Sequence, residues 1–109
     1  MATIALTQAN FDEYFAKPLL AIEFWAPWCE PCRDFSRLYE AAALKYPQII
    51  FMKVNVDQEI ALAKDFSVRS VPTLVVIHQK TMILHQAGLI PEHALWDLMD
   101  QALHIADIL

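Results

Sequence analysis

The chain has 109 residues, of which 57% are hydrophobic and 19% are charged, with 8 Lys and Arg against 13 Asp and Glu. This length fits one domain over residues 1–109 with a buried core, and so apolar a composition excludes a disordered chain. A net charge of −5 leaves no basic surface for phosphate backbones, so we expect no nucleic-acid partner.

The first predicted elements are an extended segment and a short helix. Residues 3–6 are predicted to be extended. Asn10 followed by Glu13 resembles the pair of capping residues at a helix start, and Pro18 ends that helix.

A buried strand and a long helix follow. Residues 19–25 are apolar except for Glu23 and predict a buried strand. From Cys32 onward, apolar residues recur at spacings of three and four, which predicts an amphipathic helix that ends before Pro47. The apolar residues of this helix are Phe35, Leu38, Tyr39, Ala42 and Tyr46.

The middle of the chain contains three further strands and a short helix. Residues 49–56 are rich in β-branched side chains and predict a strand, after which Asp57 caps the short helix. Residues 73–77 and 82–86 predict two strands, and the four residues 78–81 join them as a hairpin.

The last element is a helix that begins at Pro91. Its apolar stripe consists of Leu95, Leu98, Met99, Ala102, Leu103 and Ala106. Residues 104–109 carry further apolar side chains, which either continue this core helix or form a contact patch for a partner or a second copy.

These elements follow one another in the order β-α-β-α-β-α-β-β-α. Strands that are separated by helices pair in parallel, and the late hairpin adds an antiparallel edge. We therefore predict an α/β fold, a three-layer α/β/α sandwich in which four helices flank a central mixed five-stranded sheet.

The two cysteines, Cys29 and Cys32, lie between the buried strand and the start of the long helix. Backbone N–H groups and the positive end of the helix dipole stabilise a thiolate there and lower its pKa. We expect Cys29, at the turn, to be the exposed nucleophile. Cys32, one turn further in, is expected to be shielded and positioned to attack a mixed disulfide. Pro31 has a φ that suits the first helical turn.

Three other interpretations compete with redox chemistry. A structural zinc site needs four ligands, but the chain has no second cysteine pair and no closely spaced histidine pair. Covalent haem attachment requires histidine after Cys32, where Arg33 stands. The third interpretation is two inert buried cysteines, although the Trp-Pro-Trp context before the pair is unusual for a core. Redox chemistry is favoured.

Four features together resemble the thioredoxin family. Residues 23–32 resemble its active-site segment, residues 53–57 and 68–74 resemble its later motifs, and Gly88 matches in position. They occur in the order and spacing of the family, and the resemblance extends from about residue 6 to residue 102. It implies the thioredoxin fold.

The resemblance implies roles for four catalytic residues. Cys29 would be the attacking thiolate and Cys32 the resolving cysteine. Glu23 matches the buried acid of the family, usually aspartate, and would accept the proton of Cys32 directly or through water. A lone carboxylate in an apolar strand also indicates a raised pKa by itself, the alternative being an exposed acid at a strand end. Lys53 matches the lysine near that acid, the alternative being a solvent-facing side chain.

The resemblance also implies a substrate-binding surface, which consists of Trp28, Glu30, Pro31, Val71, Pro72 and Gly88. Pro72 matches the cis-proline of the family, and the backbone of Val71 would pair with an extended substrate segment. Trp28 would shape the surface, and at Gly88 the missing side chain would permit a close backbone approach.

Two positions depart from the family pattern. Glu30 stands where the family usually has glycine, and its carboxylate opposes thiolate formation at Cys29. We therefore expect a raised pKa for Cys29 and a potential at least as reducing as with glycine. The alternative is that Glu30 points into water and has little effect. Arg37 stands where the family has a mid-helix proline, which predicts a helix without an interior kink.

The N-terminus and the apolar runs indicate where the chain is located. The opening sequence has no basic residue before Lys17 and no long apolar region, so no secretory signal is visible. No apolar run approaches the about 18 residues of a membrane-spanning helix. We therefore expect a cytoplasmic location, where thiols are kept reduced, and no membrane partner.

We therefore predict a thiol–disulfide oxidoreductase that reduces protein disulfides through Cys29 and Cys32 and contributes to cell redox homeostasis. The resemblance implies a monomer without a metal or bound cofactor, which a flavoenzyme of the thioredoxin-reductase type recycles. The alternative is a binding or co-chaperone module that uses the same surface without redox turnover.

Overall fold

The computed structural model describes residues 2–108, and its elements follow the predicted order. In chain order they are β1 (Ile4–Ala5), α1 (Phe11–Phe15), β2 (Leu19–Trp25), α2 (Glu30–Lys45), β3 (Ile50–Asn55), α3 (Ile60–Asp65), β4 (Thr73–His78), β5 (Thr81–Ala87) and α4 (Glu92–Ile108). Helix α2 begins two residues earlier than predicted, because Pro31 is accommodated in its first turn, where the N–H that proline lacks is not needed.

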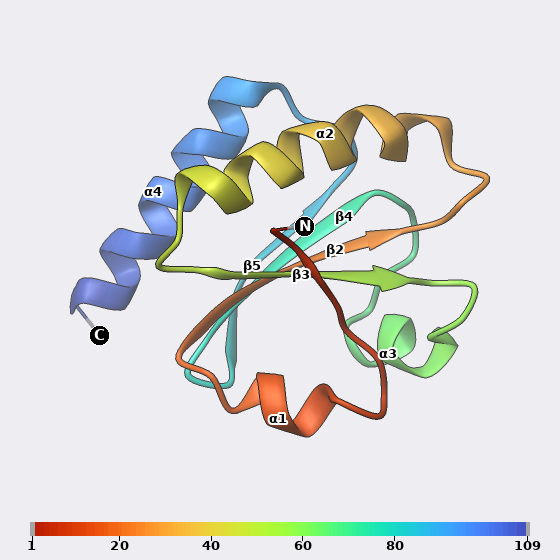
Figure 1. Ribbon diagram of the computed structural model, residues 1–109, viewed down its shortest axis with the longest axis horizontal. Helices are drawn as coiled ribbons and strands as arrows, with labels where there is room; N and C mark the ends of the chain where they lie inside the picture. The colour runs from red at the N-terminus through yellow and green to blue at the C-terminus, as the bar shows by residue number, and fades with distance from the viewer. Residues whose placement is uncertain (1, 109) are drawn as a thin grey trace.

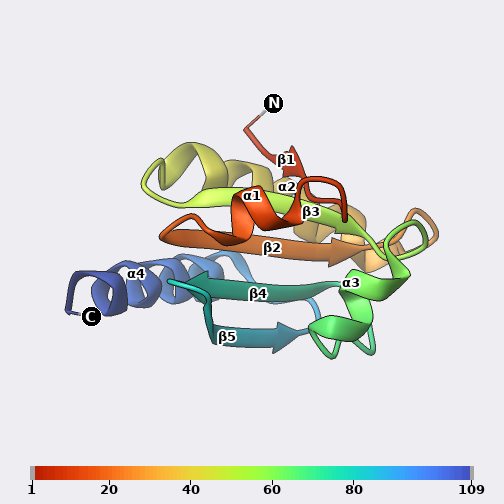
Figure 2. The same ribbon diagram turned by 90° about the horizontal axis from the view of Figure 1, so that it is seen from below.

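The five strands form one mixed sheet in the order β1-β3-β2-β4-β5. Strand β3 runs parallel to β1 and β2, whereas β4 is antiparallel to both β2 and β5. Helices α2 and α4 cover one face of the sheet, and α1 and α3 cover the other (Figures 1 and 2). The predicted three-layer sandwich is confirmed.

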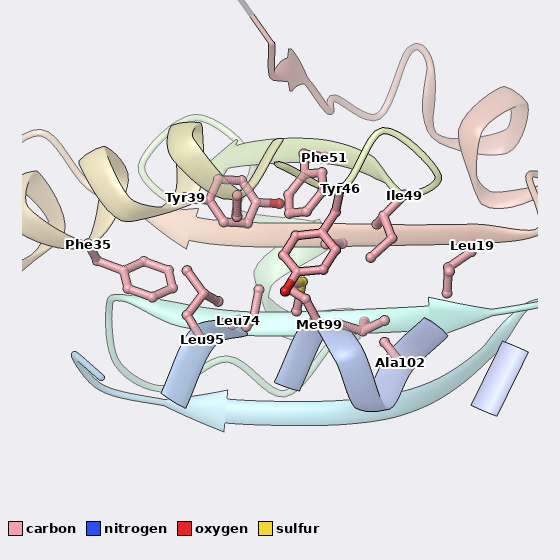
Figure 3. Close-up of a cluster of buried hydrophobic side chains, with 13 residues drawn as sticks. Leu19, Phe35, Tyr39, Tyr46, Ile49, Phe51, Leu74, Leu95, Met99 and Ala102 are labelled. Atoms are coloured by element: carbon pink, nitrogen blue, oxygen red, sulfur yellow. The ribbon is translucent and has the colours of Figure 1, made fainter. Parts of the chain in front are cut away.

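Apolar side chains fill the space between the sheet and the α2–α4 layer (Figure 3). The ring of Tyr39 on α2 meets that of Phe51 on β3 edge-on, with the centroids 5.2 Å apart. The Tyr39 hydroxyl donates a hydrogen bond of 2.7 Å to the carbonyl of Met52, so this buried polar group is satisfied. A second core lies under α1 and α3. Because both faces of the sheet are covered, its central strands β2 and β4 are predominantly apolar and buried, which contributes to the high hydrophobic fraction.

Of the two predicted helix caps, one is confirmed in position only and the other is wrong. Asn10 is the N-cap residue of α1, as predicted, but its side-chain oxygen accepts hydrogen bonds from the N–H and hydroxyl of Thr7, at 2.8 and 3.3 Å, and makes no capping hydrogen bond with the helix. Asp57 does not cap α3, whose N-cap is Glu59. Short polar side chains bond whichever neighbouring group the fold presents, and sequence spacing alone does not determine that group.

The turn between β4 and β5 is tighter than predicted. Strand β4 ends at His78 and β5 begins at Thr81, so only Gln79 and Lys80 connect them. The sequence predicted a connection of four residues, 78–81. Both turn residues have positive φ, 47° and 68°. Glycine or asparagine usually occupies such positions. Because neither residue stands at 79 or 80, the sequence did not indicate a two-residue turn.

Helix α4 continues to Ile108, as expected for an extended core helix. Leu103 and Ala106 pack on the core, whereas Ile108 is 66% exposed. Leu109 lies outside the described residues. Within residues 2–108, no helix combines the length and the apolar character that a membrane-spanning segment requires.

Candidate active site

The two cysteines form a disulfide at the start of α2. The loop that follows β2 enters α2 at this point (Figure 1). Their Cα atoms are 5.3 Å apart. Cys29 is the N-cap residue of α2, and the N–H of Cys32 donates to Cys29 Sγ at 3.2 Å. This N–H and the helix dipole stabilise negative charge on Cys29 Sγ, which is the condition for a reactive thiolate in the reduced protein.

Cys29 is less exposed than predicted. It is 5% exposed and Cys32 is 2% exposed, so the prediction of an exposed first cysteine is wrong for the disulfide form. The side chains that pack around the pair are those of Trp25, Ala26, Val56 and Val71. This apolar packing keeps most water away from the sulfurs.

The loop before β4 faces the disulfide. The Val71–Pro72 peptide bond is cis, as the resemblance implied, and the Val71 carbonyl oxygen lies 3.7 Å from Cys29 Sγ. The N–H of Gly88 donates a hydrogen bond of 2.8 Å to the Pro72 carbonyl. The β5 end therefore holds this loop in position beside the sulfur.

Gly88 has a φ of +93°, a conformation that residues with side chains rarely adopt. A Cβ at this position would meet no atom of the described chain within 4 Å. The backbone conformation therefore accounts for the glycine, and the space beside it is open to another molecule.

Trp28 lies next to the disulfide in the chain and is 70% exposed. Its indole N–H donates to the two carboxylate oxygens of Asp57, at 3.2 and 3.1 Å. A groove of about 150 Å³ lies between Trp28 and Val71. Asp57, for which the sequence predicted a helix cap, instead fixes the indole beside this groove, a role that no sequence signal indicated.

Glu23 on β2 is fully buried, so the alternative of an exposed acid is wrong. The hydroxyl of Ser36 donates a hydrogen bond of 2.8 Å to Glu23 Oε2. Among the described residues, Glu23 Oε1 has no hydrogen-bond partner and is therefore available to accept a proton. Ser36 was not among the predicted site residues, although its spacing of four residues from Cys32 places both on one face of α2.

Burial raises the pKa of Glu23 from 4.5 to about 7. Desolvation is the largest cause, because it disfavours the charged carboxylate. The hydrogen bond from Ser36 and the charge of Lys53 lower the pKa and offset part of this effect. Glu23 therefore exchanges its proton near neutral pH, as a residue that accepts a proton from a thiol must.

Lys53 on β3 is the register partner of Glu23 in the sheet. Its Nζ lies 3.7 Å from Glu23 Oε1 and 3.8 Å from Glu40 Oε2. The ammonium group also lies over the ring of Trp25, 5.3 Å from its centroid. Lys53 is therefore shared between two acids, and the alternative of a side chain that simply faces solvent is wrong.

We expect the Ser36→Ala substitution to raise the pKa of Glu23 above about 7, because it removes a hydrogen bond that stabilises the carboxylate. Ser36→Thr keeps a hydroxyl and should leave this pKa close to that of the wild type. Carboxyl ¹³C NMR titration measures both. An unchanged or lowered pKa in Ser36→Ala would contradict the role given to the hydroxyl.

Glu30 and Pro31 form the first turn of α2, and Glu30 is exposed. In the part of the chain that the structure describes, no three His, Cys, Asp or Glu side chains gather as a metal site would require.

The chain is similar to thioredoxins over nearly its whole length. The family model described as Thioredoxin matches residues 2–101. "Putative thioredoxin 2" of Streptomyces coelicolor is 38% identical over 102 residues, which are 93% of this chain and 76% of that protein. A thioredoxin of Staphylococcus haemolyticus is 32% identical over 94% of this chain and 100% of its own length. The solved structure of a mutant thioredoxin from Halobacterium salinarum has a TM-score of 0.85 at 29% identity, and the match covers 92% of this chain and 89% of that one.

Proposed function

The chain belongs to the thioredoxin family and is a thiol–disulfide oxidoreductase, and we propose that it reduces protein disulfides with Cys29 as nucleophile and Cys32 as resolving cysteine. The observation that carries the proposal is the Cys29–Cys32 disulfide at the N-terminus of α2. Ser36 on the same helix, which is bonded to the buried Glu23, supports the assignment of a proton acceptor.

The first step is attack on the substrate. In the reduced protein, the Cys29 thiolate attacks one sulfur of a substrate disulfide and forms a mixed disulfide. The other substrate sulfur leaves as a thiolate and takes up a proton. The N–H of Cys32, which is 3.2 Å from Cys29 Sγ, favours the thiolate form of Cys29.

The second step releases the substrate. Cys32 transfers its proton to Glu23 and attacks Cys29 Sγ, which forms the Cys29–Cys32 disulfide and frees the second substrate thiolate. Two electrons have then passed to the substrate. With a pKa of about 7, Glu23 is poised to take this proton at neutral pH.

The substrate segment is proposed to lie along the Val71–Pro72 loop. The backbone of Val71 next to Cys29 Sγ suits a short strand-addition contact, which Trp28 and the open space at Gly88 would flank.

The disulfide must be reduced again after each cycle. We assign this step to a flavoenzyme of the thioredoxin-reductase type that draws electrons from a nicotinamide cofactor. A cytoplasmic location, where thiols are kept reduced, would set the same direction of electron flow.

The test is the dithiothreitol-dependent reduction of insulin. Wild-type protein should accelerate it, and Cys29→Ser should leave only the rate of dithiothreitol alone. A wild-type protein that gives no acceleration would overturn the proposal. A Cys29→Ser/Cys32→Ser variant that keeps full cellular activity would point instead to a binding module.

We expect Glu30→Gly to make the potential of the Cys29–Cys32 couple less reducing. A carboxylate beside Cys29 opposes the thiolate, so its removal stabilises the reduced form. Equilibration with a glutathione redox buffer measures the potential, and Glu30→Gln should shift it in the same direction without adding glycine to the helix. An unchanged or more negative potential in both variants would contradict this expectation.

A further inference from the structure

A second cavity adjoins the disulfide, and its lining is basic. It has a volume of about 370 Å³ and is lined by both cysteines, by Arg33 and Arg37 of α2 and by Lys53 of β3. None of its lining residues among residues 2–108 is acidic. Three cations around one cavity are notable because the chain as a whole carries a net charge of −5.

Of the three cations at the cavity, Arg33 and Arg37 have no counter-ion among the described residues. They are four residues apart on α2, so their side chains share one face of the helix, and both are exposed. Across the described part of the chain, the ion pairs are those of Lys53 with Glu23 and Glu40, and neither arginine takes part in one. The charge of Lys53 is largely balanced, so the surplus positive charge at the cavity comes from Arg33 and Arg37.

Two other carboxylates lie on the same stretch of α2. Glu30 and Asp34 each precede one of these arginines by three residues, a spacing that permits pairing on a helix. The structure nevertheless places neither of them in an ion pair with an arginine, and neither lines the cavity. Both guanidinium groups therefore remain able to bind an external anion.

We propose that Arg33 and Arg37 form a carboxylate-binding subsite, and that the enzyme prefers protein disulfides with Asp or Glu close to the target cysteine. This inference rests on the proposed function. A guanidinium group binds a carboxylate through paired hydrogen bonds, which a lysine ammonium cannot do. Because both cysteines also line the cavity, a carboxylate bound there belongs to a residue near the disulfide under attack.

The cavity is separate from the groove between Trp28 and Val71. The groove is lined by Trp28, Val56 and residues 68–71, whereas the cavity is lined by residues 25–27, by residues of α2 and by Lys53 of β3. A substrate segment on the Val71 backbone can therefore make apolar contacts with Trp28 and Val68 in the groove, which Arg69 also lines, and direct an acidic side chain to the two arginines of the cavity. The groove would then recognise the apolar side chains of the segment, and the two arginines would recognise its acidic side chain.

The experiment compares two disulfide-linked peptides that differ only in carrying Glu or Gln on both sides of the cysteine. For the wild type at low salt, kcat/KM should be roughly three to tenfold higher for the Glu peptide, the range expected of exposed Arg–carboxylate contacts. This ratio should fall towards one in about 0.5 M NaCl, because salt screens such contacts. The Arg33→Gln/Arg37→Gln variant should show a ratio near one at both salt concentrations.

The matched control is Lys17→Gln/Lys64→Gln. It also removes two positive charges, but from exposed positions just after α1 and in α3, away from the cavity. It should therefore keep the wild-type ratio. An equal loss of the ratio in both double variants would show general charge steering and overturn the subsite, as would a wild-type ratio near one. If the wild type reduces neither peptide, the proposed function itself has failed.

Discussion

Replacing Glu23 with glutamine should stabilise the oxidised protein by up to about 3 kcal/mol above pH 8, and by almost nothing near pH 4. The reason is the fully buried carboxyl group, whose pKa is raised from 4.5 to about 7 by desolvation. Glutamine has nearly the same shape and an oxygen that can accept the hydrogen bond from Ser36, but it carries no charge to bury.

The sign of the effect follows from proton binding. Well below pH 4.5 the carboxyl group is neutral in both the folded and the unfolded chain, and Glu23 contributes no pH-dependent destabilisation. Between about pH 4.5 and about 7 the unfolded chain ionises first, so the folded state binds more protons and its stability falls as pH rises. Well above pH 7 both states are ionised, and the full penalty of the buried charge is present.

Denaturant unfolding of the oxidised protein over this pH range measures the difference between wild type and Glu23→Gln. Glu40→Gln is the matched control, because Glu40 faces the same lysine but is 32% exposed. Its removal should change the free energy of unfolding by less than about 1 kcal/mol. A stability difference for Glu23→Gln that stays constant from pH 4 to pH 8 would show that the carboxyl group does not titrate as its burial requires.

Sequence patterns predicted the elements whose identity depends on long apolar stretches. The β2 strand has the predicted bounds, because seven residues with one interruption have few alternatives to a buried strand. The same interruption marked Glu23 as unusual, and the structure explains it through the Ser36 hydroxyl and the Lys53 ammonium group. The resemblance supplied the cis bond before Pro72, which the residues alone did not predict.

Features that depend on contacts between distant segments were not predictable in the same way. Asp57 is 29 residues from Trp28, and only the folded chain brings its carboxylate to the indole N–H. Likewise, the low exposure of Cys29 results from packing against Val56 and Val71, which belong to other loops. Sequence spacing describes one helix or strand at a time, whereas these contacts join the loop before α2 with the loops after β3 and before β4.

Replacing Cys32 with serine should trap the enzyme as a mixed disulfide on Cys29. Serine cannot displace the substrate sulfur, so release depends on an external thiol. Multiple-turnover reduction should fall by at least about a thousandfold, because a well-placed intramolecular group acts at an effective concentration of about 10⁵ M or more. Intact mass spectrometry after one cycle should find the protein plus one substrate chain.

The geometry also predicts which cysteine carries that adduct. Cys29 Sγ receives the N–H of Cys32 and lies 3.7 Å from the Val71 carbonyl, beside the loop on which the substrate is proposed to bind. Cys32 is the more buried of the two and lies within the first turns of α2. Cys29→Ser should therefore accumulate no adduct under the same conditions. A stable adduct on Cys32 in that variant would reverse the order of attack, and Glu23 would then accept the proton of Cys32 in the first step and not in the second.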